Sequence, residues 1–126
     1  LFSYLLSMRH RVKKHLHLNG KDKAHRKSVV RNLTTALFEH GAITTTKKRA
    51  LAIVPVVEGL IELAKGDHTE YNKIRLIAPQ VFTEKSSREV LKAGETYKDR
   101  TGGYTRITPL KYRDGDSAIL VKIELV

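Results

Sequence analysis

The sequence predicts an α+β domain of two layers, with about four helices on one side of a small three-stranded sheet. Apolar residues recur with helical spacing in four segments between residues 23 and 94. A β-branched run at 42–46 and an alternating apolar run at 118–125 indicate strands, and residues 104–109 form a third after a glycine turn. One helix, one strand, three helices and a terminal hairpin favour the α+β class.

Length and composition predict a single folded domain, and the sequence before it divides into two short segments. A length of 126 residues fits one domain, and 40% hydrophobic with 29% charged residues suits a folded soluble protein. Residues 1–7 are expected to be an extension before Met8, too short for a membrane span and unlike a secretory signal. Residues 8–21 form a basic arm, and residues 22–126 form the globular domain. The absence of cysteine excludes disulfides and thiolate metal sites.

The positive charge is concentrated at the front of the chain. The net charge is +11, and residues 8–31 hold nine lysines or arginines against one acid, Asp22. A polyanion is therefore the expected partner, with an acidic membrane surface as the weaker alternative. Residues 8–21 lack apolar periodicity and contain an Asn19-Gly20 turn signal, so we expect an extended arm ordered by what it binds.

The first helix is predicted over about residues 23–40, with Asp22 as its N-cap and Gly41 at its end. Lys23, Lys27 and Arg31 recur every four residues on one face, which continues the charge of the arm and favours contact with a polyanion over simple solvation. Phe38 lies off the apolar stripe and indicates a wide core face or a second packing surface. The apolar stripe comprises Val29, Val30, Leu33, Ala36 and Leu37.

A second helix is predicted over about residues 47–65, after a strand at 42–46, with Thr46 as its cap and Gly66 at its end. Its first residues, Lys47-Lys48-Arg49, oppose the helix macrodipole, which indicates an external anion. Pro55 is expected to kink the helix and Gly59 to weaken it. The expected buried stripe is Leu51, Val54, Val57, Ile61 and Ala64.

Two further helices are predicted before the hairpin. Asp67 with Glu70 resembles a capping box for a helix that ends before Pro79, and Ser86 with Glu89 resembles a second box for a short helix that stops near Gly94. Val81 and Phe82 between them are expected to anchor the chain. The expected apolar positions are Tyr71, Ile74, Leu76 and Ile77 in the first of these helices, and Val90 and Leu91 in the second.

The terminal hairpin is predicted from a turn at 101–103, a strand at about 104–109 and a loop at Arg113-Asp114-Gly115-Asp116. In the last strand Ile119, Val121, Ile123 and Leu125 alternate with mixed residues and predict one buried face.

Catalytic and metal chemistry are not favoured. His10, His15, His17 and His25 lie among cations and lack zinc-site spacing, so neither a metal nor another cofactor is expected. The Gly102–Arg106 block lacks the lysine and the following helix of a phosphate-binding loop. Asp114 and Asp116 suit an ordinary turn better than a cation site. No nucleophile–base pair is indicated by the spacing, so the protein is not expected to be an enzyme.

Several blocks of the sequence match a known family in the same order over residues 8–126. The chain resembles the family of the bacterial large-subunit ribosomal protein numbered seventeen. Two departures are proline at Pro55, where family members often have it at the position of Gly59, and residues 1–7, which have no family counterpart. The matching blocks are Met8-Arg9-His10-Arg11, Ala24-His25-Arg26-Lys27, Arg31-Asn32-Leu33, Ile43-Thr44-Thr45-Thr46, Val56-Val57-Glu58, Leu60-Ile61, Gly102-Gly103-Tyr104-Thr105-Arg106 and Ile123-Glu124-Leu125-Val126.

The resemblance implies a non-catalytic component of the large ribosomal subunit that binds large-subunit ribosomal RNA near the exit of the nascent-chain tunnel, beside other ribosomal proteins. It implies a mixed three-stranded sheet, and a cytoplasmic bacterial ribosome or an organellar one, with neither a membrane nor a small-molecule substrate as partner. A DNA-binding factor or a nuclease remains as an alternative. The expected RNA-binding residues are Arg9, His10, Arg11, Lys13, Lys14, His15, Lys21, Lys23, His25, Arg26, Lys27, Arg31, Lys47, Lys48, Arg49, Tyr104 and Arg106.

Overall fold

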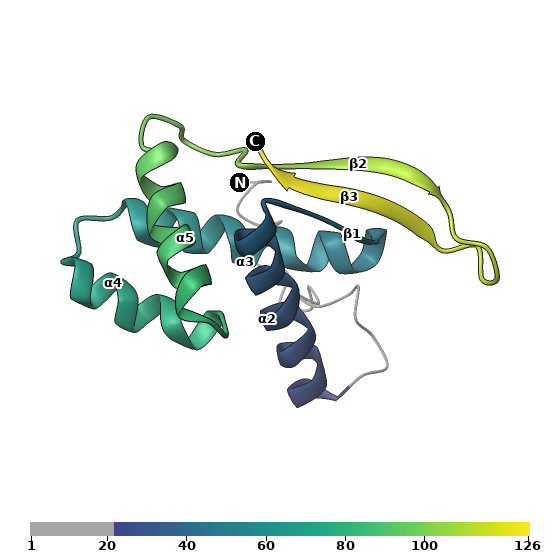
Figure 1. The fold of residues 1–126 in the computed structure, drawn as a ribbon, viewed down its shortest axis with the longest axis horizontal. Coiled ribbons are helices and arrows are strands. Elements are labelled where there is room, and N and C mark those ends of the chain that lie inside the picture. Colours follow the sequence, from purple (N-terminus) through teal and green to yellow (C-terminus); the bar gives the residue numbers. More distant parts are fainter. Residues whose placement is uncertain (1–21) are drawn as a thin grey trace, which may run out of the picture.

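The computed structural model describes residues 22–126 (Figure 1), so the predictions for residues 1–21 lie outside the described part of the chain. The predicted α+β class and the four predicted α-helices are confirmed. In chain order the elements are α2 (Lys23–His40), β1 (Ala42–Thr46), α3 (Lys47–Lys65), α4 (Glu70–Ile77), the 3-10 turn η2 (Ala78–Gln80), α5 (Glu84–Thr96), β2 (Thr105–Tyr112) and β3 (Ile119–Leu125).

The sheet has the order β1-β3-β2, and both neighbouring pairs are antiparallel. The expected mixed sheet is therefore wrong in this detail: β1 and β2 run in the same direction, but β3 lies between them and hydrogen-bonds to both. Lys122 of β3 pairs with Thr44 on one side and with Thr108 on the other. The β2–β3 hairpin extends beyond the end of β1 (Figure 1), and a bulge at Pro109–Lys111 falls on the edge strand, where proline is tolerated.

Helix α2 has the bounds that its capping residues predict. The backbone N–H of His25 donates to Asp22 Oδ1 at 2.6 Å, and Gly41 ends the helix with φ of 79° and an N–H bond to Leu37 O at 2.7 Å. Leu37 and Phe38 are both buried, so the helix has a wide core face rather than a narrow apolar stripe.

Helix α3 lies at the centre of the domain and contacts α2, α4, α5 and all three strands. Because neighbours surround it, its buried set differs from the predicted stripe: Leu51 is 37% exposed and Val54 is only half-buried. Thr46 occupies the N-cap position without a side-chain capping bond, and α3 continues through Pro55. The buried residues of α3 are Ala50, Ala52, Ile53, Val57, Leu60, Ile61 and Ala64.

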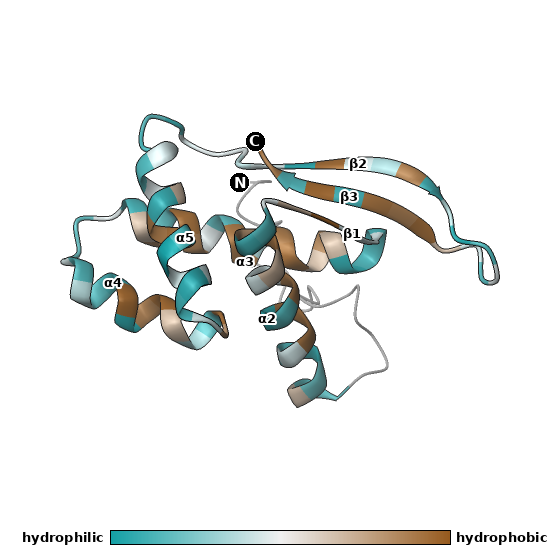
Figure 2. Cartoon of the chain, in the orientation of Figure 1, coloured by the Kyte–Doolittle hydropathy of each residue, from teal (hydrophilic) through white to brown (hydrophobic). Residues whose placement is uncertain are grey.

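The core lies between the sheet and the helices. Figure 2 shows hydrophobic residues along α3 and β3, which face each other across this layer. Val121 and Ile123 of β3 are buried as predicted, whereas Ile119 lies toward the hairpin tip and is 38% exposed. Fully buried apolar side chains of this kind each contribute about 1.5–3 kcal/mol to the free energy of unfolding.

Helices α4 and α5 begin at different caps from those predicted. Thr69 Oγ1 accepts from the N–H of Asn72 at 3.4 Å, and Thr83 Oγ1 accepts from that of Ser86 at 3.1 Å. Asp67 and Ser86 are therefore not the N-caps, because a threonine lies closer to each helix start and takes the role.

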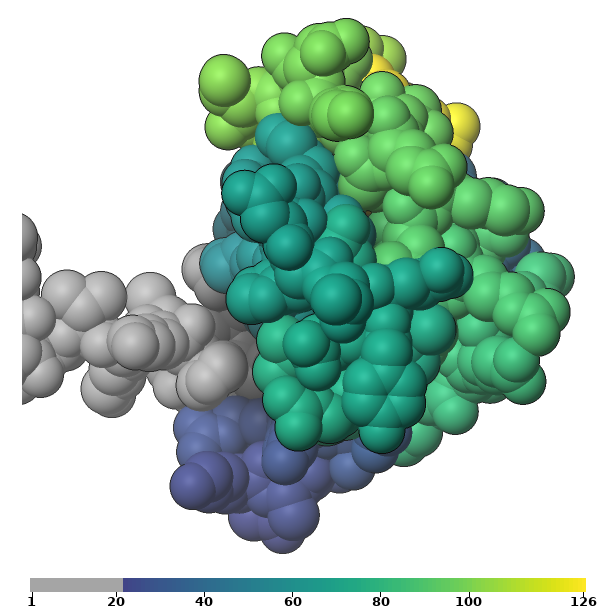
Figure 3. Space-filling model, turned by 90° about the vertical axis from the view of Figure 1, so that its left-hand side faces the viewer, coloured from purple at the N-terminus to yellow at the C-terminus, as the bar shows by residue number. Residues whose placement is uncertain are grey.

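The outward side of α4 is more apolar than the sequence predicts. Of its four expected core residues only Ile77 is buried, and Tyr71 is 77% exposed. Figure 3 shows the surface of α4 at the centre of one face of the molecule, beside α5. Since α4 packs against the core through one end, Ile74 and Leu76 are left exposed.

Helix α5 ends at Thr96, close to the predicted end, but Gly94 itself is a packing position inside the helix and not its terminator. A Cβ placed on Gly94 would lie 2.6 Å from Ala64 Cβ and 2.9 Å from the Ala64 carbonyl carbon. The missing side chain lets α5 approach α3 closely. Gly59 of α3, by contrast, is exposed, with nothing within 4 Å of a built Cβ.

The two helical glycines therefore predict opposite effects of alanine on the free energy of unfolding, measured by urea denaturation. Gly59→Ala is expected to stabilise by about 0.8 kcal/mol, because alanine favours the helix and meets no neighbour. Gly94→Ala is expected to destabilise by about 1–3 kcal/mol, because the new methyl group overlaps the backbone of Ala64. A stabilising effect of Gly94→Ala would show that this close approach is absent.

Candidate nucleic-acid interface

The first two turns of α2 present an exposed cluster of cations. Lys23 and Lys27 are exposed and Arg26 is half-buried, all on a helix whose start is fixed by the Asp22 cap. None of the three has an ion pair within 4.0 Å to an acid among residues 22–126. His25 is also exposed here. The charge of these side chains is thus available to an external anion, as the sequence predicts.

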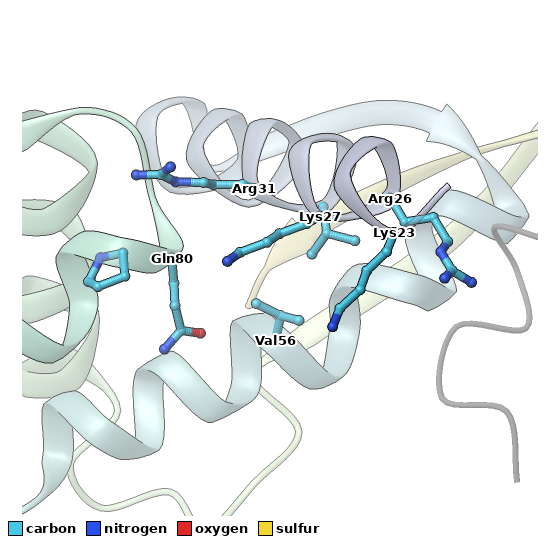
Figure 4. Close-up of a pocket in the computed structure, with 8 residues that line it drawn as sticks. Lys23, Arg26, Lys27, Arg31, Val56 and Gln80 are labelled. Carbon is cyan, nitrogen blue, oxygen red and sulfur yellow. The ribbon is translucent and has the colours of Figure 1, made fainter. Parts of the chain in front are cut away.

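A groove of about 360 Å³ lies beside this cluster, between α2, α3 and η2. Figure 4 shows Lys23 and Lys27 reaching from α2 toward α3, and Val56 and Gln80 on the opposite side. The lining residues are Lys23, Arg26, Lys27, Val30, Arg31, Val56, Pro79 and Gln80, and they include four cations and no acid.

Arg31 is bound within the domain, although its place in the Lys23–Lys27–Arg31 stripe predicts an RNA contact. Its Nη2 donates to Val81 O at 2.9 Å and to Ala78 O at 3.3 Å, and its Nε donates to Val81 O at 3.3 Å. The guanidinium carbon lies 4.0 Å from the centre of the Phe82 ring, within cation–π range. Arg31 therefore holds the segment after α4 against α2, and its donors are largely committed.

Thr35 provides a second link at the same place. Its Oγ1 donates to Arg31 O at 2.8 Å and accepts from the N–H of Phe82 at 3.0 Å. Together with buried Val81, these contacts fix the wall of the groove that η2 forms. Val81 is the anchor that the sequence predicts, whereas Phe82 is 48% exposed and packs on Arg31.

A second group of cations begins α3. Lys47, Lys48 and Arg49 are exposed and have no ion pair within 4.0 Å to an acid in the described part of the chain. In Figure 1 the start of α3 lies beneath the hairpin, away from the start of α2. The two groups therefore form separate cationic surfaces.

Tyr104, which the sequence predicts as an RNA contact, is 1% exposed and packs inside the described domain. Its hydroxyl accepts from Lys65 Nζ at 2.8 Å and lies within hydrogen-bond reach of the Glu62 carboxylate and of Arg100 O, at 3.0 Å from the latter. Its ring packs 5.2 Å from that of Tyr97. The glycine–tyrosine block at 102–106 therefore has a structural role. Gly103 provides the positive φ of 67° that the turn needs.

The groups around Tyr104 shift the pKa values of two of its neighbours, Lys65 and Tyr97. The hydrogen bond to Tyr104 and the nearby Glu62 raise the pKa of the Lys65 ammonium, against the opposing effect of its desolvation. Burial raises the pKa of Tyr97, an effect that Arg100 partly offsets. Because the pKa of folded Lys65 is raised, its contribution to stability is present below about pH 10.5 and is lost as the pH rises through the folded value.

Arg106 is exposed, but its charge is shared with the sheet. Its Nη1 lies 3.8 Å from Glu124 Oε1, its cross-strand partner, and Lys122 Nζ lies 3.4 Å from the other oxygen of that carboxylate. Such exposed pairs contribute at most about 1 kcal/mol. Arg106 therefore remains accessible, with weaker net charge than the α2 cluster.

In the hairpin loop Asp116 binds within the turn, which is ordinary turn chemistry. Asp116 binds Arg113 through two contacts, at 3.0 and 2.5 Å, and accepts from the N–H of Ala118 at 3.2 Å. Arg113 holds the pKa of Asp116 at about 2, so this contribution to stability is lost only as the pH falls from about 3.8 toward 2.

The remaining predicted contacts lie outside the described residues. They are Arg9, His10, Arg11, Lys13, Lys14, His15 and Lys21. Within residues 22–126, no group of three or more histidine, aspartate or glutamate side chains is placed to hold a metal ion, and no helix is long and apolar enough to cross a membrane.

The fold and the surface define the class: a small, basic α+β domain with groups of exposed cations, unpaired within residues 22–126, at the starts of α2 and α3, as expected of a protein that binds a polyanion. The family model described as "Ribosomal protein L17" matches residues 29–126. The chain belongs to this family, which makes it a ribosomal protein with a structural role and not an enzyme.

Curated relatives agree over most of the chain. The "Large ribosomal subunit protein bL17" of Carboxydothermus hydrogenoformans is 42% identical over 108 residues, covering 85% of this chain and 95% of the relative. The protein of the same name from Chloroflexus aurantiacus is 41% identical over 110 residues, covering 86% of this chain and 93% of the relative. The family resemblance that the sequence motifs indicate is therefore confirmed.

The position of Tyr104 predicts a loss of stability without a loss of binding when its hydroxyl is removed. Tyr104→Phe is expected to lower the free energy of unfolding by about 1 kcal/mol, because a buried hydrogen-bond partner of Lys65 is lost. RNA affinity should remain unchanged. Tyr112→Phe is the matched control, since Tyr112 is 69% exposed and should leave stability unchanged. Weaker RNA binding by folded Tyr104→Phe would contradict the structural role.

Proposed function

We propose that this chain is a structural constituent of the large ribosomal subunit that binds large-subunit ribosomal RNA through its basic arm, residues 8–21, and the cationic start of α2. Relatives that carry the large-subunit name in full support the first part. The second part rests on the charge of the arm and of α2, which follow one another directly in the sequence.

The observation that carries the proposal is the unneutralised charge at the start of α2. Lys23, Arg26 and Lys27 have no ion pair with a described acid, whereas Arg88 and Lys92 of α5 pair with acids of their own helix at 2.5 and 3.3 Å. An uncompensated cation cluster gains free energy when phosphates replace its counterions. It lies at the end of the domain that the arm joins, so arm and helix can follow one RNA backbone together.

The other exposed cations extend the same proposal. Lys47, Lys48 and Arg49 at the start of α3, together with Arg106, are placed to meet RNA at a second surface. Two cationic surfaces on different sides of one small domain suit a protein set among RNA segments and neighbouring ribosomal proteins. We place it near the exit of the nascent-chain tunnel, in a cytoplasmic bacterial ribosome or an organellar one.

The salt dependence of RNA affinity tests this proposal. We expect the slope of log affinity against log salt to become shallower by about 1.4–1.8 in Lys23→Gln/Lys27→Gln, because two phosphate contacts are lost. Removal of residues 8–21 should flatten the slope further and leave the helical circular dichroism of residues 22–126 in place. The measurement is filter binding to large-subunit ribosomal RNA between about 50 and 200 mM salt.

The matched control is Lys85→Gln/Lys98→Gln, which removes two exposed lysines outside α2 and α3. This double substitution is expected to change the slope of log affinity against log salt very little. If the control pair flattens the slope as much as the α2 pair does, binding depends on total charge and the assigned surface is wrong.

A further inference from the structure

The groove beside the α2 cations has a chemistry that charge alone does not explain. Three of its lining residues, Val30, Val56 and Pro79, are apolar. The ammonium groups of Lys23 and Lys27 lie beside Val56 in the same groove (Figure 4). A site for phosphate alone would need no apolar floor. An apolar slot bordered by ammonium groups fits a ligand with a flat, weakly polar body and a negatively charged backbone.

We propose that this groove holds one unpaired nucleotide of the bound RNA, with the base against Val30, Val56 and Pro79 and its flanking phosphates on Lys23 and Lys27. The inference rests on the proposed RNA-binding function and adds a specific site to it. Gln80 lines the same groove and is exposed, so its side-chain amide can donate to and accept from the edge of the base. Proteins that read single-stranded RNA commonly stack the base faces on flat side chains and hydrogen-bond the base edges. Here Val30, Val56 and Pro79 would take the place of the aromatic side chains.

The size and the charge of the groove favour a nucleotide. About 360 Å³ is near the lower end of the volume range for small-ligand sites, which suits a single nucleotide. The charge agrees, because four cations and no acid line the groove.

The groove is also held open by the fold. Arg31 and Thr35 bind the segment at 78–82, so the wall formed by Pro79 and Gln80 is fixed relative to α2. A preformed site of this kind loses little conformational entropy when the base enters.

The test measures the binding of the full chain to large-subunit ribosomal RNA. Val56→Gln makes the floor polar without a change of charge and is expected to weaken binding about tenfold, with the salt slope unchanged. Gln80→Ala removes the edge contact from an exposed position and is expected to weaken binding about threefold. Leu110→Gln is the matched control, because Leu110 is 52% exposed on β2 and outside the groove, and it should bind as the unaltered chain does. Thermal melts verify that each variant is folded.

The outcomes separate the groove from the general function. If the unaltered chain binds RNA tightly and both groove variants bind equally well, the nucleotide site is wrong while the proposed function stands. If the groove variants keep full RNA affinity but fail to enter large subunits, the groove holds a protein segment and the inference is overturned. If the unaltered chain does not bind RNA, both the proposed function and the inference fail.

Discussion

The packing of α3 at the centre of the domain is the constraint on which the other elements depend. This helix contacts the three other α-helices and all three strands, and it carries the largest share of the buried apolar residues. Its alanines leave room for close neighbours, and at Ala64 the absence of a side chain on Gly94 brings α5 into direct backbone contact. Because α3 fixes both layers, the sheet and the helices hold one arrangement relative to each other.

The second link joins this core to the cationic surface. Arg31 and Thr35 tie the middle of α2 to the segment between α4 and α5, while buried Leu37 and Phe38 fix its end. The start of α2 therefore projects from a rigid mount, and its lysines are held in a defined position although they are exposed. A fixed array of cations can match the spacing of phosphates, which a flexible segment must first be ordered to do.

Much of this fold is predictable from local sequence, because local chemistry decides it. Asp22 and Gly41 mark the ends of α2 correctly, since capping and positive φ depend on adjacent residues. The predictions that differ from the structure concern residues whose partners lie far away in the sequence. Arg31 has the helical spacing of a surface cation, yet its partners lie some fifty positions away. Tyr104 belongs to a conspicuous motif, yet Lys65 and Glu62 place it in the core. The groove likewise cannot be predicted from the sequence, because Val30, Val56 and Gln80 come together only in the folded chain.

Lysine footprinting tests the central claim, that the start of α2 faces ribosomal RNA. An amine-specific reagent would label the free chain and the chain assembled in large subunits, with each lysine read by mass spectrometry. Our account predicts strong protection of Lys23 and Lys27 in the subunit, and continued labelling of Lys92 on α5, which is 71% exposed in the free domain. Equal labelling of Lys23 and Lys27 in the free and assembled protein would contradict it.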